Sequence, residues 1–176
     1  MISIMIDWIR SLPQQQHTYE EGQHLFHRND PVRSMFFIEE GTAQLVRHHR
    51  DGGVAVLQRA GPGSMLAEAS LFASAYHCDA VAIEPVTAML IARRNLRRLF
   101  LTSPDFAQAW AMHLSAEVRN ARTRAEILSL RTIAQRLDAW IAEKGALPDK
   151  GSWKSLALEI AVSPEALYRE IARRRQ

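Results

Sequence analysis

The distribution of turn-forming residues constrains the fold of this chain more than any other feature. Up to about residue 91, glycine, proline and short Asn-Asp or Asp-Gly segments divide the sequence into brief apolar runs. Glycine and proline are then absent from residues 105–144. Short runs between turns are typical of antiparallel strands, whereas a long uninterrupted segment is typical of helix. The sequence therefore predicts an α+β chain with its strands first and its helices second.

The strand-forming half resembles a β-sandwich or barrel in its spacing. Apolar runs such as Met35–Ile38 and Val54–Leu57 are typical of strands. The clearest hairpin signal is Asp51-Gly52-Gly53, since these residues suit the tight turns that match strand twist. We expect an N-terminal helix and an antiparallel, jelly-roll-like β-roll in residues 1–103. The turn signals are Gly22, Asn29-Asp30-Pro31, Gly41, Asp51-Gly52-Gly53, Gly61-Pro62-Gly63 and Glu84-Pro85.

A long amphipathic helix is predicted for residues 104–131. Ser103 is a suitable N-cap, Pro104 fits the first helical position, and Asp105 complements the positive end of the helix dipole. The stripe has more apolar surface than one small β-domain covers, which favours pairing with a second copy in a homodimer. The alternative is that the stripe packs only against its own β-roll. Its members are Phe106, Trp110, Leu114, Val118, Ala121, Ala125 and Leu128.

Residues 132–176 are predicted to form a helical domain. A helix around residues 133–142 is closed by Gly145 and Pro148. A second helix is expected from Trp153 to Val162, followed by a break at Ser163-Pro164 and a third helix from Glu165 to Arg175. This pattern predicts a helix-turn-helix, whose helices need apolar contacts at fixed positions. Leu156, Ala157, Ile160, Val162 and Leu167 occupy those positions.

The start of the third helix carries the candidate DNA contacts. In a helix-turn-helix, the N-terminal part of the second helix of the pair reads base edges in the major groove. Arg169 could donate two hydrogen bonds to guanine, and Glu165 could accept one from cytosine. The alternative is that these are ordinary solvated side chains on a helical hairpin. The predicted DNA-binding residues are Ser163, Glu165, Ala166, Tyr168, Arg169 and Arg173, the last within an Arg173–Arg175 cluster suited to phosphate contact.

Composition excludes several classes of protein. The only cysteine, Cys78, rules out an intrachain disulfide and a cysteine-built zinc or iron–sulfur site. The N-terminus lacks the features of an export signal, and no apolar stretch is long enough to span a bilayer, so we expect a cytoplasmic protein without a membrane partner. The formal net charge of +3 is weak evidence for nucleic acid by itself. No catalytic motif occurs, so we expect no enzyme activity.

Together the two halves resemble the Crp/Fnr family of bacterial regulators, over roughly residues 18–173. Leu25–Pro31, Met35–Ile38 and Gly41 resemble the family's cyclic-nucleotide-domain signature, with Asn29 at a position that is usually glycine. Asparagine also tolerates a left-handed turn. The resemblance implies a dimeric transcription regulator whose partners are double-stranded DNA, a small-molecule effector and RNA polymerase.

The resemblance also locates an effector cassette. In family members that bind cyclic nucleotides, a glutamate takes the ribose hydroxyl, and an arginine and a hydroxyl residue hold the phosphate. Glu68 matches the glutamate, but Cys78 and Asp79 stand at the phosphate-binding positions. A cation is lost and an anion gained, so we expect no tight binding of cyclic AMP; the alternative is a nucleotide held by a changed contact set. The predicted pocket residues are Leu66, Ala67, Glu68, Ala69, Ser70, Cys78 and Asp79.

No metal or other cofactor is expected. Some family members carry haem, and histidine and thiol are good iron ligands, which draws attention to His77-Cys78. Adjacent residues of a strand point to opposite faces, however, so these two side chains should not share one ion. The same argument applies to His48-His49.

Departures from the family pattern lie near the C-terminus. Pro164 replaces a residue that is often arginine, Ala161 replaces the usual turn glycine, and Glu170 replaces a residue that is usually apolar. We expect the small β-wing that the family usually adds after the last helix to be missing, and some phosphate contacts with it. The rival interpretation is therefore a ligand- or protein-binding sensor module that has lost DNA binding.

Overall fold

The computed structural model describes residues 2–50 and 52–174. The chain forms two compact units, with the boundary after Leu114. This boundary lies inside the predicted dimerisation helix rather than at either of its ends. Within the described residues, no helix is both long and apolar enough to cross a membrane.

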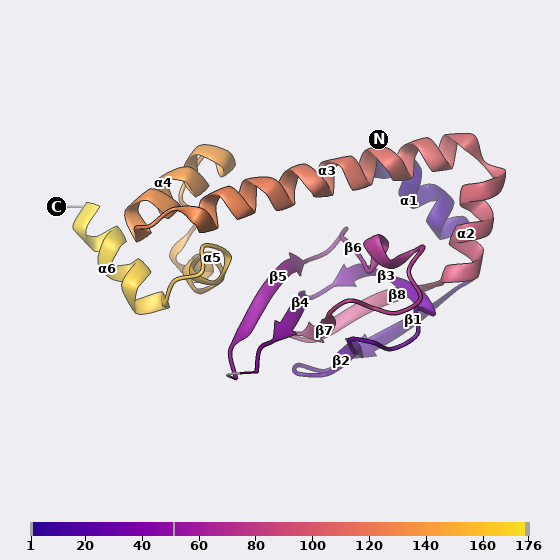
Figure 1. Cartoon of the computed structure of the whole chain (residues 1–176), viewed down its shortest axis with the longest axis horizontal. Coiled ribbons are helices and arrows are strands. Elements are labelled where there is room, and N and C mark those ends of the chain that lie inside the picture. The colour runs from indigo at the N-terminus through magenta and orange to yellow at the C-terminus, as the bar shows by residue number, and fades with distance from the viewer. Residues whose placement is uncertain (1, 51, 175–176) are drawn as a thin grey trace. The chain divides into compact units, whose positions relative to one another are not determined.

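The first unit is an antiparallel β-roll with flanking helices (Figure 1). One four-stranded sheet has the order β1-β8-β3-β6 and the other β2-β7-β4-β5. The predicted antiparallel roll is thus confirmed. Its strands are β1 (Gln14–Tyr19), β2 (His24–Phe26), β3 (Ser34–Glu40), β4 (Ala43–His48), β5 (Val54–Ala60), β6 (Met65–Leu66), β7 (Asp79–Ala82) and β8 (Val86–Ala92). The helices are α1 (Ile2–Ser11), η1 (Glu68–Ser70), α2 (Arg93–Thr102) and the first part of α3 (Pro104–Ser129).

The predicted turns position these strands. Asn29 has a φ of 70°, consistent with its place at a usual glycine position. Gly41 has a φ of 77°, and a Cβ there would lie 2.0 Å from the Pro85 carbonyl oxygen, so no other residue fits. The β4–β5 hairpin forms, but residues 49–53 link its strands, a longer connection than the tight turn expected. Asp51 of that turn lies outside the described residues.

The core of the roll includes residues from its flanking helices. Ile9 of α1, Leu96 of α2, and Phe106 and Trp110 of α3 are fully buried among the strand residues. The Ser103 hydroxyl accepts a hydrogen bond from the Phe106 backbone N–H at 3.2 Å, which confirms the predicted N-cap. The N-terminal end of the apolar stripe therefore packs on the roll. The helix α2 is absent from the sequence-based prediction.

The second unit contains the end of α3 and three further helices. These are α4 (Ile133–Lys144), α5 (Trp153–Glu159) and α6 (Pro164–Arg174), with a short 3₁₀ turn, η2 (Lys150–Ser152). Gly145 ends α4 with a φ of 89°, as its predicted closing role requires. The unit has its own apolar core, built from Ile127, Leu137, Trp153, Leu156, Ala157, Ile160, Leu167 and Ile171.

Candidate nucleic-acid interface and effector cassette

The connection between α5 and α6 is a tight turn around a left-handed residue. The α5 helix ends at Glu159, so the predicted continuation to Val162 is wrong. Ala161 has a φ of 50°, and the Val162 N–H donates to the Ala157 carbonyl at 2.9 Å. The helix thus ends three residues earlier than expected, and the fully buried Ile160 is its C-cap. The position at which the resemblance expects a turn glycine is therefore left-handed in this chain and is occupied by alanine.

Apolar contacts hold α5 and α6 together as the sequence predicts. Leu156, Ala157 and Ile160 are fully buried, as is Leu167 of α6. Val162 is half-buried and packs against the same core. The absence of a side chain beyond Cβ at Ala157 permits the close approach.

The beginning of α6 is capped by Ser163. Its hydroxyl accepts a hydrogen bond from the Ala166 N–H at 3.2 Å. Hydrogen bonds from the backbone N–H of Glu165 and from Ser163 lower the pKa of the Glu165 carboxyl, and the nearby Arg169 guanidinium contributes further. Glu165 is therefore a carboxylate at neutral pH, placed at the positive end of the helix.

The candidate contact residues differ in exposure. Glu165 and Arg169 are exposed, whereas Ala166 is half-buried. Tyr168 is also half-buried, and its ring centroid lies 5.5 Å from that of Trp153. Tyr168 thus has a packing role within the unit. A shallow hollow of about 310 Å³ is lined by Ile133, Ala166, Arg169, Glu170 and Arg173.

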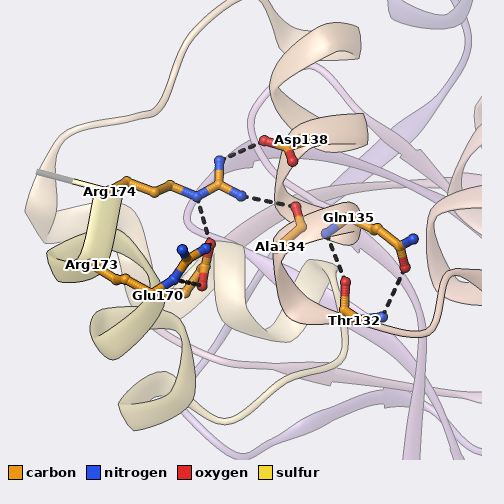
Figure 2. Close-up of polar contacts among 7 residues, drawn as sticks. All are labelled: Thr132, Ala134, Gln135, Asp138, Glu170, Arg173 and Arg174. Carbon is orange, nitrogen blue, oxygen red and sulfur yellow. Dashed lines mark hydrogen bonds and ion pairs between the residues drawn. The ribbon is translucent and has the colours of Figure 1, made fainter.

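Glu170 binds two arginines of the predicted phosphate-contact cluster (Figure 2). Arg173 donates to both carboxylate oxygens, at 3.0 and 2.8 Å. Arg174 donates to Glu170 at 2.7 Å, to Asp138 of α4 at 2.6 Å and to the Ala134 carbonyl at 3.0 Å. The arginines lower the pKa of Glu170 to about 2. Arg175 lies outside the described residues.

This arrangement explains the charged residue at a usually apolar position. Arg174 joins α6 to α4 through its contacts with Asp138 and the Ala134 carbonyl. Ile171 is buried beside it and supplies the apolar contact that Glu170 cannot. In α4 itself, Thr132 and Gln135 form a reciprocal capping box, visible in Figure 2.

Arg136 is a structural residue that the sequence analysis did not identify. Its guanidinium donates to the carbonyls of Leu130 and Leu128 at the end of α3, at 2.8 and 3.1 Å. It also donates to the carbonyls of Ile160 and Ala161 at 3.0 Å. Carbonyls at helix C-termini lack partners within the helix and carry partial negative charge. Arg136 satisfies two such ends at once and holds the turn before α6.

The effector cassette forms a mostly buried segment of the roll. Leu66, Ala67, Glu68 and Ser70 are buried, whereas Ala69 is exposed. Ala67 is left-handed, with a φ of 66°, and begins the 3₁₀ turn η1. The Ser70 hydroxyl lies 3.5 Å from Nδ1 of His77.

Cys78 and Asp79 face different surroundings. Cys78 lies in the roll core, and burial raises the pKa of its thiol to about 11. The Asp79 carboxylate instead accepts a hydrogen bond from the Arg28 N–H at 3.0 Å and lies 3.6 Å from Nδ1 of His27. The side chains of Cys78 and Asp79, both assigned to the predicted pocket, therefore do not line one common site.

An arginine that the sequence analysis did not consider lies beside the cassette. Arg47 of β4 donates to the His77 carbonyl at 3.0 Å. Burial is the main cause of the lowered pKa of His77, and the Arg47 charge adds to it. The same charge opposes the effect of burial on Cys78. A guanidinium from β4 thus lies beside the segment that carries His77 and Cys78.

With this geometry in place, comparison with known proteins assigns the first unit. Residues 16–103 match the cyclic nucleotide-binding domain family, from β1 to the end of α2. The chain belongs to that family. No curated protein sequence matches the chain significantly.

Several solved structures share the fold. FixK2 from Bradyrhizobium japonicum is 16% identical with a TM-score of 0.76, and the match covers 92% of this chain and 84% of that one. The c-di-GMP-responsive global regulator CLP from Xanthomonas campestris is 18% identical with a TM-score of 0.70, over 98% and 91% of the two chains. TTHB099 from Thermus thermophilus, a CRP-family transcriptional regulator, is 18% identical with a TM-score of 0.66, over 90% and 84%. At these identities the likeness shows the fold.

Proposed function

We propose that this protein is a sequence-specific DNA-binding transcription regulator of the Crp/Fnr type that acts as a homodimer. The observation that carries the proposal is the α5–turn–α6 pair. Its helices share a buried core at the positions a helix-turn-helix requires, and α6 begins with a capped, exposed face. The fold shared with known regulators supports the same conclusion.

Arg169 and Glu165 are the proposed base-reading residues. Both are exposed near the start of α6, one turn apart, where a recognition helix enters the major groove. Arg169 matches guanine by a bidentate contact, and Glu165 matches the amino group of cytosine. Ser163 fixes the start of the helix, and Ala166 leaves room for a close approach. Tyr168 supports the helix from within the unit through Trp153.

The middle of α3 supports dimer formation. Val118 is 48% exposed, and Ala121 and Ala125 of the same stripe are also exposed. An apolar helix face of this kind is stabilised by pairing with the same face of a second copy. Two recognition helices would then lie about 34 Å apart on a palindromic site.

The effector proposed for the roll is a small molecule other than cyclic AMP bound in the usual manner. Cys78 is a buried neutral thiol at the position of the family's phosphate-binding arginine, and Asp79 is turned toward β2. Arg47 offers a guanidinium from a different direction. A ligand recognised here would therefore use a contact set centred on Glu68, Ser70 and Arg47.

Selection of bound DNA from a random pool at physiological salt tests the proposal. The wild-type protein is expected to enrich a palindrome, and Arg169→Ala should relax the preference at one position of each half-site by about 1–3 kcal/mol. Arg94→Ala, which removes an exposed arginine of α2, is the matched control and should leave the enriched sequence unchanged. Failure of the wild-type protein to enrich any sequence would contradict the proposal.

A second candidate function has one specific observation in its favour. Arg173 and Arg174 are already paired with carboxylates, so they contribute less to phosphate binding than free arginines would. A sensor module that binds a ligand or protein but not DNA would suit such a surface. Weak, salt-sensitive DNA binding without sequence preference is the result that would support it.

A further inference from the structure

Two histidines and an aspartate come together on the roll, away from the buried part of the effector cassette. His24 belongs to β2, His27 follows that strand, and Asp79 is the first residue of β7. One nitrogen of each imidazole and one carboxylate oxygen all lie within 4.8 Å of one another. Figure 1 shows β2 and β7 as neighbouring strands. Residues distant in sequence thus form a cluster with the ligand types that zinc uses.

A β-bulge places the two histidines on the same side. In a regular strand, residues three positions apart point to opposite faces. Here His24 is paired with Val81 and Phe26 with Ala80, so β2 advances by two residues while β7 advances by one. The extra residue in β2 forms a bulge, which reverses the faces to which the following side chains point. The rings of His24 and His27 consequently stack, with centroids 4.3 Å apart.

Hydrogen bonds hold Asp79 and the backbone of His27 in position without a bound ion. Asp79 is held by the Arg28 N–H at 3.0 Å, and its side chain is only 15% exposed. The backbone of His27 is tied to Asp30 in both directions: its N–H donates to the Asp30 carboxylate at 3.2 Å, and its carbonyl accepts from the Asp30 N–H at 3.2 Å. The oxygen that accepts from Arg28, Oδ1, is also the one that lies 3.6 Å from Nδ1 of His27, and a carboxylate oxygen keeps a second lone pair for a metal. Outer hydrogen bonds of this kind orient metal ligands.

We propose that His24, His27 and Asp79 bind a divalent transition-metal ion, with Zn²⁺ as the best match. Zinc accepts imidazole nitrogen and carboxylate oxygen at about 2.0–2.2 Å in tetrahedral geometry, which sets the ligand atoms about 3.3 Å apart. His24 and His27 are exposed, so rotation of their side chains can close the remaining distance. Water would occupy the fourth position. The ion would tie β2 to β7 and stabilise that edge of the roll.

Calorimetric titration of the full, untagged chain with ZnCl₂ tests the site. One Zn²⁺ per chain is expected, and His24→Ala and His27→Ala should each weaken binding by at least about tenfold. Asp79→Asn should do the same while keeping an acceptor for the Arg28 N–H. His48→Ala and His49→Ala are matched controls, because these adjacent exposed histidines lie outside the cluster.

Thermal unfolding and Co²⁺ absorption provide readouts independent of DNA binding. Zinc should raise the midpoint of unfolding of the wild-type protein and of the two controls but not of the cluster variants, because a ligand of the folded state stabilises it. Bound Co²⁺ should give visible bands that the cluster variants lose. The inference is overturned if the wild-type chain binds no zinc, or if the control variants lose zinc as the cluster variants do.

Discussion

At the scale of single residues, the turn before α6 contains a backbone conformation that its residue disfavours. Ala161 has a φ of 50°, a region that costs a residue with a Cβ about 1–2 kcal/mol. Glycine adopts it without this penalty. Alanine at this position therefore gives a less stable turn than glycine would.

Replacing Ala161 by glycine is expected to stabilise the second unit by about 1 kcal/mol, since relief of strain exceeds the entropy lost by glycine on folding. Urea denaturation followed by circular dichroism measures the change. Gly145→Ala is the converse control, because Gly145 has a φ of 89° and should destabilise when given a Cβ. A lower stability for Ala161→Gly would show that the turn is not strained.

Some residue-scale features could be predicted from sequence and others could not. The N-caps Ser103 and Ser163 could be predicted because the local pattern of serine, proline and acid determines them. The early end of α5 could not, since alanine at position 161 favours helix when considered alone. The conformation of Ala161 depends on tertiary interactions, namely the burial of Ile160 and the hydrogen bonds from Arg136 to the carbonyls of Ile160 and Ala161.

At the scale of elements, one side chain joins the ends of two helices. Arg136 of α4 donates to carbonyls at the end of α3 and in the turn that follows α5. The Leu128 carbonyl lies in the last turn of α3, and the other three follow helix ends, where carbonyls lack helical partners. The orientation of α6 therefore depends on an arginine of a different helix.

Arg136→Met is expected to destabilise the second unit by about 2–3 kcal/mol, because charge-assisted hydrogen bonds are lost while the carbonyls stay partly buried. Circular dichroism during urea denaturation gives the free energy of unfolding. Arg131→Met, which removes a neighbouring exposed arginine, should change it by less than about 0.5 kcal/mol. Equal effects of the two substitutions would contradict the assigned role.

Most element types and their order could be predicted, although α2 could not, and beyond the α5–α6 pair the contacts between elements could not be predicted either. Turn residues and apolar periodicity indicate the roll, α3 and the C-terminal helices. The cluster of His24, His27 and Asp79 escaped the analysis because strict alternation separates the histidines, and a bulge is not visible in sequence. Arg47 escaped it because its approach to His77 depends on how β4 lies in the sheet.

At the scale of the whole molecule, α3 contributes to both cores and leaves an apolar segment between them. Phe106 and Trp110 belong to the core of the roll, and Ile127 belongs to the core of the second unit. Val118 lies between these residues and is 48% exposed. This distribution is the basis for expecting a homodimer.

Val118→Glu is expected to shift the protein from dimer to monomer, since it places like charges at the centre of the paired helices. Sedimentation velocity at micromolar concentration measures the change, which should be at least tenfold in the dimer dissociation constant. Leu101→Glu is the control, because Leu101 is 77% exposed but lies on α2. A wild-type protein that sediments as a monomer would contradict the expected dimer.

The single cysteine lies in only one of the two cores. Cys78 is 1% exposed, and its raised pKa keeps the thiol neutral near pH 8, so a thiol reagent cannot attack it while the roll is closed. The second unit contains no cysteine at all. The rate at which Cys78 is alkylated therefore reports how often the roll opens and does not respond to opening of the second unit. Ligands of the roll can be ranked by how far they lower that rate, without any probe being added to the protein.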